Sequence, residues 1–180
     1  MRVLVVSDIH GSGYYADKLE EIIKKENPDK IIVLGDLYYH GPRNPLTDEY
    51  APMKVANLLN SLKDKIEVIR GNCDAEVDQM ISEFKVKDNI QEKINGKQMF
   101  FTHGHKYNID NPPPEDFDIM FYGHYHICFI KKYEGKLFVN PGSISLPKEN
   151  TPHSYAMIKE KDIIIKDVDG NIVEEYKYKE

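Results

Sequence analysis

The segment Val3-Leu4-Val5-Val6-Ser7-Asp8-Ile9-His10 passes from an apolar run directly into an acid and a histidine. A short, continuous apolar run of this kind predicts a strand that is buried on both faces. The same transition recurs at Ile32-Val33-Leu34-Gly35-Asp36 and at Val68-Ile69-Arg70-Gly71-Asn72. Polar groups at the ends of buried strands are typical of α/β folds, in which ligands bind at those ends.

Helical patterns separate these three strands. Apolar residues at helical spacing predict one helix over about residues 14–26, which Asn27-Pro28 ends, and a second around residues 55–62. The first third of the chain is therefore predicted as β-α-β-α-β. This order implies a parallel sheet with right-handed crossovers.

The remaining two thirds are rich in strand-like runs. Asn95-Gly96 lies between two of them, at residues 90–94 and 98–102, and predicts a hairpin. Further strands are expected at residues 119–122, 137–139, 155–158, 163–168 and 172–178, the last three as an antiparallel meander. An α/β first half and a β-rich second half predict a four-layer αββα sandwich, with two mixed β-sheets face to face and helices outside.

Composition excludes several classes of protein. The 180 residues suggest a single domain over residues 1–180, and 24 basic against 30 acidic residues give a net charge of −6. That balance argues against a nucleic-acid groove and against a polybasic membrane anchor. No apolar run approaches the roughly 20 residues of a membrane span, and residues 1–7 are too short for a signal peptide. With two cysteines, a cytoplasmic protein is expected, and a homo-oligomer is compatible with the sequence.

Seven side chains that can bind metals follow predicted strand ends. They are two carboxylates, one amide and four imidazoles: Asp8, His10, Asp36, Asn72, His103, His124 and His126. Seven donors are too many for one tetrahedral zinc, whereas two metals that share a carboxylate can use them all. This donor set suits Mn, Fe, Zn, Co or Ni. Two cations roughly 3.5–4 Å apart can clamp the attacking and leaving oxygens of a phosphoryl transfer.

The order D-x-H, G-D, G-N-x-D, H-x-H and G-H-x-H over residues 8–143 resembles that of the calcineurin-like metallophosphoesterase superfamily. Further stretches, at residues 40–44, 70–80, 102–105 and 140–143, resemble the YfcE-type bacterial phosphodiesterases. The resemblance implies the αββα sandwich, with a dimetal site at the strand ends that Mn usually activates.

The resemblance also implies how the ligands divide between two divalent metal ions. One ion would take Asp8, His10, Asp36 and His126, and the other would take Asp36, Asn72, His103 and His124. Asp36 would bridge the two ions, together with a water or hydroxide. That hydroxide is expected to attack the phosphorus of a small phosphodiester.

A few residues near the seven donors are candidates for further roles. His105 is expected to contact substrate, to orient a ligand or only to pack. His40 and Arg43, in the loop after Asp36, are candidates for binding a phosphate, with a plain surface loop as the alternative. Asp74 either orients a neighbouring group or caps a turn, and His153, which lies outside every motif, is expected to be structural.

Cys73 stands where many members of the superfamily have a histidine that helps to protonate the leaving oxygen. A thiol is a poor proton donor to an alkoxide, and the YfcE-type proteins also have Cys at this position. The leading hypothesis is therefore a metal-dependent phosphodiesterase with Asp36, Asn72, Cys73 and His105 at its catalytic site. Two alternatives stay open, namely a phosphomonoesterase and a non-catalytic protein-binding scaffold such as the retromer subunit that resembles this fold. Because a scaffold can lose the His of D-x-H, the presence of His10 favours an enzyme.

Overall fold

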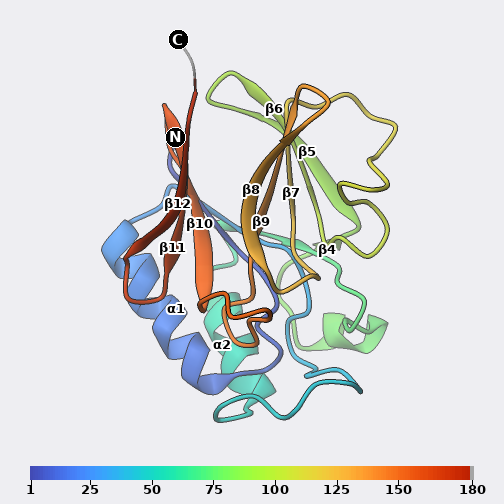
Figure 1. Ribbon diagram of the computed structural model, residues 1–180. Helices are drawn as coiled ribbons and strands as arrows, with labels where there is room; N and C mark the ends of the chain where they lie inside the picture. Colours follow the sequence, from blue (N-terminus) through green and yellow to red (C-terminus); the bar gives the residue numbers. More distant parts are fainter. Residues whose placement is uncertain (179–180) are drawn as a thin grey trace.

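The computed structural model describes residues 1–178 and forms two mixed β-sheets that face each other (Figure 1). The larger sheet has the strand order β12-β11-β10-β1-β2-β3-β4, and the smaller has the order β5-β6-β7-β9-β8. The strands are β1 (Val3–Val6), β2 (Lys30–Val33), β3 (Ile66–Ile69), β4 (Val86–Lys87), β5 (Asn89–Ile94), β6 (Lys97–Thr102), β7 (Ile119–Tyr122), β8 (Cys128–Tyr133), β9 (Lys136–Pro141), β10 (Ser154–Ile158), β11 (Asp162–Asp167) and β12 (Ile172–Lys177).

The first third of the chain folds as the sequence predicts. Strands β1, β2 and β3 are parallel, and helices α1 (Gly13–Glu26) and α2 (Pro52–Ser61) connect them. The side chain of Ser12 caps α1 by accepting a hydrogen bond from the backbone N–H of Tyr15. The helix ends at Asn27 in the left-handed conformation. Pro52 begins α2, where its missing N–H costs no intrahelical hydrogen bond.

The predicted hairpin and meander are also present. Strands β5 and β6 pair antiparallel around Asn95-Gly96, and β10, β11 and β12 form the antiparallel meander. Strand β10 also pairs antiparallel with β1, which places the meander beside the start of the chain. In the smaller sheet β6, β7 and β9 run parallel, so their carboxyl ends meet at one edge.

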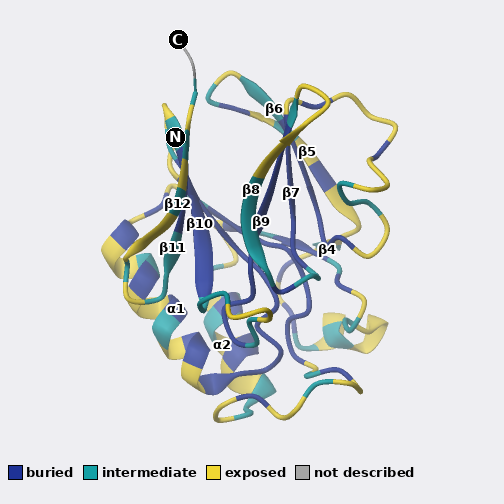
Figure 2. Cartoon of the chain, viewed as in Figure 1, coloured by how far each residue is buried: buried dark blue, intermediate teal, exposed yellow. Residues whose placement is uncertain are grey.

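Side chains alternate across β1 and build two cores. Leu4 and Val6 pack with both helices, whereas Val3 and Val5 pack between the sheets. Strands β1, β7 and β10 are buried along their length, whereas β8 and β12 are partly exposed, and the helices expose their outer faces (Figure 2). A short 3-10 helix, η1 (Glu76–Met80), precedes β4.

The fourth layer is a loop. Phe117, with Tyr107 and Ile109 beside it, packs on the outer face of the smaller sheet, in a cluster with Phe100, Met120, Tyr122 and Phe138. Within residues 1–178 no α-helix covers this face, and the prolines at residues 112–114 disfavour a helix in the covering loop. The predicted sandwich of two mixed sheets is confirmed, with both α-helices on the larger sheet.

The part of the chain that the structure describes, residues 1–178, has no helix long and apolar enough to cross a lipid bilayer.

Candidate metal centre

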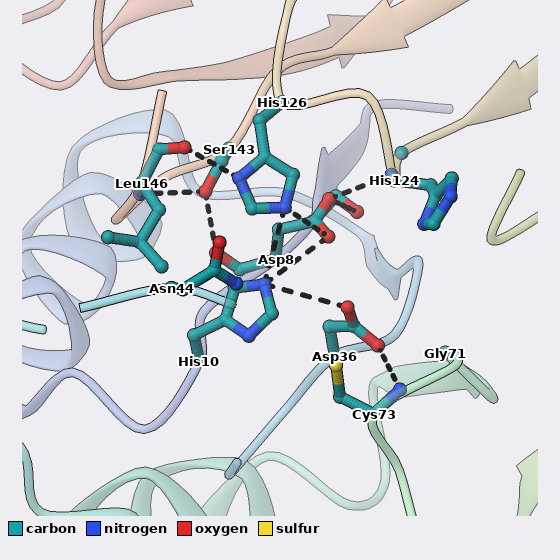
Figure 3. Close-up of polar contacts among 12 residues, drawn as sticks. Asp8, His10, Asp36, Asn44, Gly71, Cys73, His124, His126, Ser143 and Leu146 are labelled. Carbon is teal, nitrogen blue, oxygen red and sulfur yellow. Dashed lines mark hydrogen bonds and ion pairs between the residues drawn. The ribbon is translucent and has the colours of Figure 1, made fainter. Parts of the chain in front are cut away.

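The strand ends bring the predicted donors to one edge of the sandwich. Asp8 and His10 follow β1, Asp36 follows β2 and Asn72 follows β3 in the larger sheet. His103 follows β6, and His124 and His126 follow β7 in the smaller sheet. Asp8, His10, Asp36 and His126 face one another across the two sheets in Figure 3.

The backbone is strained where it carries these side chains. Positive φ angles occur at five of the seven donors: Asp8 (56°), His10 (49°), Asp36 (54°), His124 (63°) and His126 (60°). Each such residue costs on the order of 1–3 kcal/mol, because the Cβ atom crowds the backbone in this conformation. A concentration of that cost at one edge is typical of a functional site that the surrounding fold holds in place.

Three of the four histidines are held in one tautomer. In each ring Nδ1–H donates a hydrogen bond to a backbone carbonyl, so that in the neutral ring the lone pair of Nε2 is directed into the site. The donor–acceptor distances are 2.8 Å from His10 to Tyr39, 2.7 Å from His103 to Leu34 and 2.6 Å from His126 to Leu146. This arrangement is typical of histidines that ligate metals.

Asp8 and two histidines form a site that fits a cation. Nε2 of His126 lies 3.2 Å from Asp8 Oδ1, and Nε2 of His10 lies 3.3 Å from Nε2 of His126. Asp8 Oδ1 is buried and accepts no hydrogen bond, whereas its Oδ2 accepts from Ser7 and from the backbone N–H of His124. Burial raises the pKa of Asp8, but the imidazoles of His10 and His126 outweigh it and hold that pKa well below its ordinary value. A cation would complete the bonding of the buried oxygen and the facing nitrogens.

Asp36 lies between two groups of donors. Its Oδ2 is 3.5 Å from Nε2 of His10 and 3.5 Å from Nε2 of His103, while its Oδ1 accepts a hydrogen bond of 2.8 Å from the backbone N–H of Cys73. On the far side, His103 Nε2 lies 3.0 Å from Oδ1 of Asn72. One carboxylate oxygen thus faces both groups, as a shared ligand requires.

His124 stands apart from the tightest groups. Its ring centroid lies 5.2 Å from that of His103, and the ring is directed away from Asp8 and His10 in Figure 3. The groups whose donor atoms lie within 4.8 Å of one another include Asp8 with His10 and His126, and Asp8 with Asp36 and His103. Burial, and then the charge of His103, lower the pKa of His124 to about 4, so its ring is neutral and keeps a free lone pair.

Two further residues position the donors: Asp74, for which the sequence left two roles open, and Ser143, for which it predicted none. Asp74 accepts three backbone hydrogen bonds, from Gly71 (2.7 Å), Leu37 (2.8 Å) and Asp36 itself (2.9 Å), although burial raises its pKa. It therefore fixes the turn that carries Asp36. On the other side, the Ser143 hydroxyl donates a 2.7 Å hydrogen bond to the backbone carbonyl of Asp8.

Gly71 leaves no room for a side chain. A Cβ atom there would lie 2.0 Å from Oδ1 of Asp36 and 2.3 Å from its backbone nitrogen. Gly71→Ala should therefore displace Asp36, lower the free energy of unfolding by about 1–3 kcal/mol and weaken metal binding. Calorimetric metal titration and thermal unfolding would measure both effects.

Gly96 supplies the control for that substitution. It also has a positive φ, 85°, but a Cβ atom there meets nothing within 4 Å. Gly96→Ala should lower stability through backbone strain and leave the metal affinity unchanged. Equal metal affinity in Gly71→Ala and the parent would show that the position of Asp36 does not depend on the absence of a side chain at residue 71.

Cys73 and His105 lie beside the second group of donors. Burial, and then the charge of Asp36, raise the pKa of the Cys73 thiol to about 12, and its Sγ accepts a 3.3 Å hydrogen bond from Nδ2 of Asn72. His105 is exposed, with its ring centroid 5.4 Å from that of His103. Burial of part of the ring and the charge of His103 lower the pKa of His105, which argues for a neutral imidazole.

A cavity of about 630 Å³ opens beside these residues. Arg43 lines it together with Asp36, Asn72, Cys73 and His126. His40 instead holds the loop, since its backbone carbonyl accepts a 2.7 Å hydrogen bond from Nδ2 of Asn44.

His153 has the structural role that the sequence predicts. Its ring stacks on Tyr15 at a centroid distance of 4.4 Å, and its Nε2 lies 2.9 Å from the Tyr15 hydroxyl.

Comparison with known proteins identifies the family. The family model of the calcineurin-like phosphoesterase superfamily domain matches residues 1–162. Phosphodiesterase YfcE of Escherichia coli strain K12 is 40% identical over 161 residues, which cover 88% of this chain and 87% of YfcE. The probable metallophosphoesterase YsnB of Bacillus subtilis strain 168 is 29% identical over 168 residues, which cover 88% of this chain and 83% of YsnB.

Solved structures agree with the sequence matches. The structure of YfcE, a phosphoesterase from E. coli, superposes with a TM-score of 0.94 at 34% identity and covers 98% of this chain and 99% of its own. Vps29 of Chaetomium thermophilum has a TM-score of 0.69 at 17% identity, covers 100% of this chain and 99% of its own, and shares the fold alone. The chain therefore belongs to the calcineurin-like phosphoesterase superfamily and is a hydrolase of phosphoester bonds.

Proposed function

We propose that this chain is a metal-dependent phosphodiesterase that hydrolyses a small phosphodiester at a site for two divalent cations. The observation that carries the proposal is the buried, unpartnered Oδ1 of Asp8, which faces the Nε2 atoms of His10 and His126. The similarity to YfcE, which is named a phosphodiesterase, supports the choice of reaction.

The distances support two overlapping sets of ligands. Asp8, His10 and His126 surround one position, and Asn72 with His103 borders the other. Asp36 Oδ2 lies at equal distances from His10 and His103 and would serve both cations. His124, beside His103, would complete the second set by turning its ring toward it. These donors suit Mn²⁺ and also accept Zn²⁺, Fe²⁺, Ni²⁺ or Co²⁺.

When bound, two divalent cations would lower the pKa of a water shared between them and balance charge on the phosphoryl oxygens. The chain's own residues prepare the site. Backbone carbonyls hold the Nε2 atoms of His10, His103 and His126 toward the centre, and the N–H of Cys73 holds Asp36 Oδ1, so that Oδ2 stays free. Arg43 reaches the cavity in which the phosphodiester would bind.

Neither Cys73 nor His105 supplies a cationic acid for the leaving oxygen. Cys73, with its pKa raised to about 12, is a weak proton donor, and His105 has a lowered pKa. A substrate with a leaving group that departs without a proton suits such a site, and the similarity to phosphodiesterase YfcE favours a diester.

A non-catalytic scaffold is the second candidate function. The likeness to Vps29 structures shows a shared fold and favours neither function. The complete set of seven donors favours catalysis, since a scaffold has no use for the strained backbone that carries five of them.

Parallel assays with a nitrophenyl phosphodiester and nitrophenyl phosphate, each with added Mn²⁺, test the proposal. The diester should be hydrolysed faster than the monoester. Asp36→Asn, which removes the shared charge and keeps the volume, should lower diester turnover by at least about 10²-fold. Asp64→Asn, at an exposed position, is the matched control and should leave turnover unchanged. Faster monoester turnover would favour a phosphomonoesterase, and an inactive parent across several divalent metals would favour the scaffold.

A further inference from the structure

Two cationic side chains, Arg43 and Lys148, line the cavity beside the candidate metal centre. Both are exposed, and neither forms an ion pair with any residue in the range 1–178. Asp36 is the one acid that lines this cavity within the same range, and its oxygens already face His10, His103 and the N–H of Cys73. The cavity wall is thus locally basic in a chain whose net charge is −6.

The loop that carries Arg43 is fixed against His10. The carbonyl of Tyr39 accepts the Nδ1–H of His10 at 2.8 Å, and the hydroxyl of Thr47 donates to the carbonyl of His10 at 3.1 Å. Within the loop, Asn44 closes a turn on the carbonyl of His40. The position of Arg43 is therefore coupled to that of a metal-binding candidate.

The turn that carries Lys148 is fixed in the same way against His126. The backbone N–H of Lys148 donates to the carbonyl of His126 at 2.9 Å, and the carbonyl of Leu146 accepts the Nδ1–H of His126 at 2.6 Å. The hydroxyl of Thr151 donates to the carbonyl of Lys148 at 2.8 Å and closes the turn. Since the Nε2 atoms of His10 and His126 are 3.3 Å apart, the segments bearing Arg43 and Lys148 adjoin the same pair of histidines.

A count of the charges at the site indicates what kind of group Arg43 and Lys148 could bind. Two divalent metal ions would carry four positive charges, and the carboxylates of Asp8 and Asp36 would neutralise two of them. A phosphodiester and the attacking hydroxide, each with one negative charge, offset the remainder. Arg43 and Lys148 are then in excess, and a cavity of about 630 Å³ is large enough for a small-molecule ligand.

We infer that Arg43 and Lys148 bind a second anionic group of the substrate, namely a terminal phosphate carried by one arm of the phosphodiester. Arginine can form two parallel hydrogen bonds to phosphate oxygens, and lysine adds a compact positive charge. The inference rests on the proposed phosphodiesterase function and names the class of substrate for that site.

Two matched nitrophenyl phosphodiesters test the inference. In one the propyl arm ends in a methoxy group, and in the other it ends in a phosphate monoester. The charged diester should have the higher kcat/KM by about tenfold or more, the effect of roughly one charge-assisted hydrogen bond. The double substitution Arg43→Gln with Lys148→Gln should bring the ratio of the two kcat/KM values close to one. Lys93→Gln, at an exposed lysine of β5 without an ion pair in the described chain, should keep the parent ratio.

Equilibrium binding provides a readout that does not depend on turnover. Calorimetry would compare methoxypropyl phosphate with propanediol bisphosphate, titrated into the Mn²⁺-loaded protein. The bisphosphate should bind about tenfold more tightly to the parent and to Lys93→Gln, but not to the double variant. Equal affinities for the parent, or a preference that survives in the double variant, would overturn the inference. A protein that binds with this preference but hydrolyses neither diester would instead contradict the proposed phosphodiesterase function.

Discussion

Removal of divalent cations should abolish phosphodiester turnover and leave the two-sheet fold intact. The three apolar clusters that hold the layers together contain none of the seven candidate ligands. Without a cation, Asp8 Oδ1 stays buried without a partner, and the facing imidazoles cannot act on a phosphoryl group. Chelation, followed by metal analysis, circular dichroism and a turnover assay, would measure both effects. Addition of Mn²⁺ should restore activity.

The dependence of stability on pH should distinguish the metal-free from the metal-loaded protein. Burial alone would lower the pKa of His103, but Asp36 and Asp8 raise it to about 9 from its ordinary value of 6.5 in the metal-free protein. A raised pKa means that the folded state holds this proton more tightly than the unfolded state does. The resulting stabilisation is complete below about pH 6.5 and is lost as the pH rises through about 9.

A bound cation would take the place of that proton on His103. The loaded protein should therefore keep its stability over the same pH range, and its metal affinity should rise with pH as the competing proton dissociates. Thermal unfolding of both forms across this range would test the prediction. Full activity in protein shown to contain negligible metal would exclude the two-cation mechanism, and parallel stability curves would exclude His103 as a ligand.

The fold could be predicted from the sequence because its patterns are local. The run Val3–Val6 is apolar on both faces because the strand is covered on both sides of its sheet. Asn95-Gly96 specifies a hairpin because these two residues favour the backbone conformation of a tight turn. The outer layer on the smaller sheet was harder to predict. This layer depends on the packing of Phe117 and Tyr107 against strands that are distant in sequence. A loop has no hydrophobic periodicity from which its packing surface could be predicted.

The candidate site was predictable as a list of donors but not as a geometry. The order of the motifs indicates that Asp8 and His126 are metal ligands. Nothing in the sequence, however, indicates that Oδ1 of Asp8 accepts no hydrogen bond. The carbonyls of Tyr39 and Leu146, which fix two of the imidazoles, are backbone groups that every residue possesses. Lys148 lies outside every motif and reaches the cavity only through its turn on His126.

Replacement of Cys73 by histidine should change how turnover depends on the leaving group. Cys73 lines the cavity next to Asn72, and its Sγ belongs to a group with donor atoms of His10 and Asp36 within 4.8 Å of one another. An imidazole has an ordinary pKa near 6.5 and is partly protonated at neutral pH, so Cys73→His would supply the missing acid. General-acid assistance is typically worth about 10²–10⁴-fold where a proton must be transferred.

The gain should therefore appear only with leaving groups that need a proton. Nitrophenolate departs without one, so nitrophenyl diesters should gain little, whereas alkyl diesters and phosphate monoesters should gain more. The measurement is the ratio of Cys73→His to parent turnover across leaving groups of rising pKa, with metal occupancy checked in both proteins. A ratio that rises along the series supports the acid's position at residue 73.

A ratio of Cys73→His to parent turnover that stays constant along the series would have one of two physical causes. A structure of the Cys73→His variant would distinguish them. Gly41 borders the thiol closely, since a Cβ atom on Gly41 would lie 3.2 Å from Cys73 Sγ. A larger imidazole could push this loop, and Arg43 with it, away from the cavity, which would lower turnover of every diester equally. If the loop keeps its place and the ratio is still flat, residue 73 does not face the leaving oxygen.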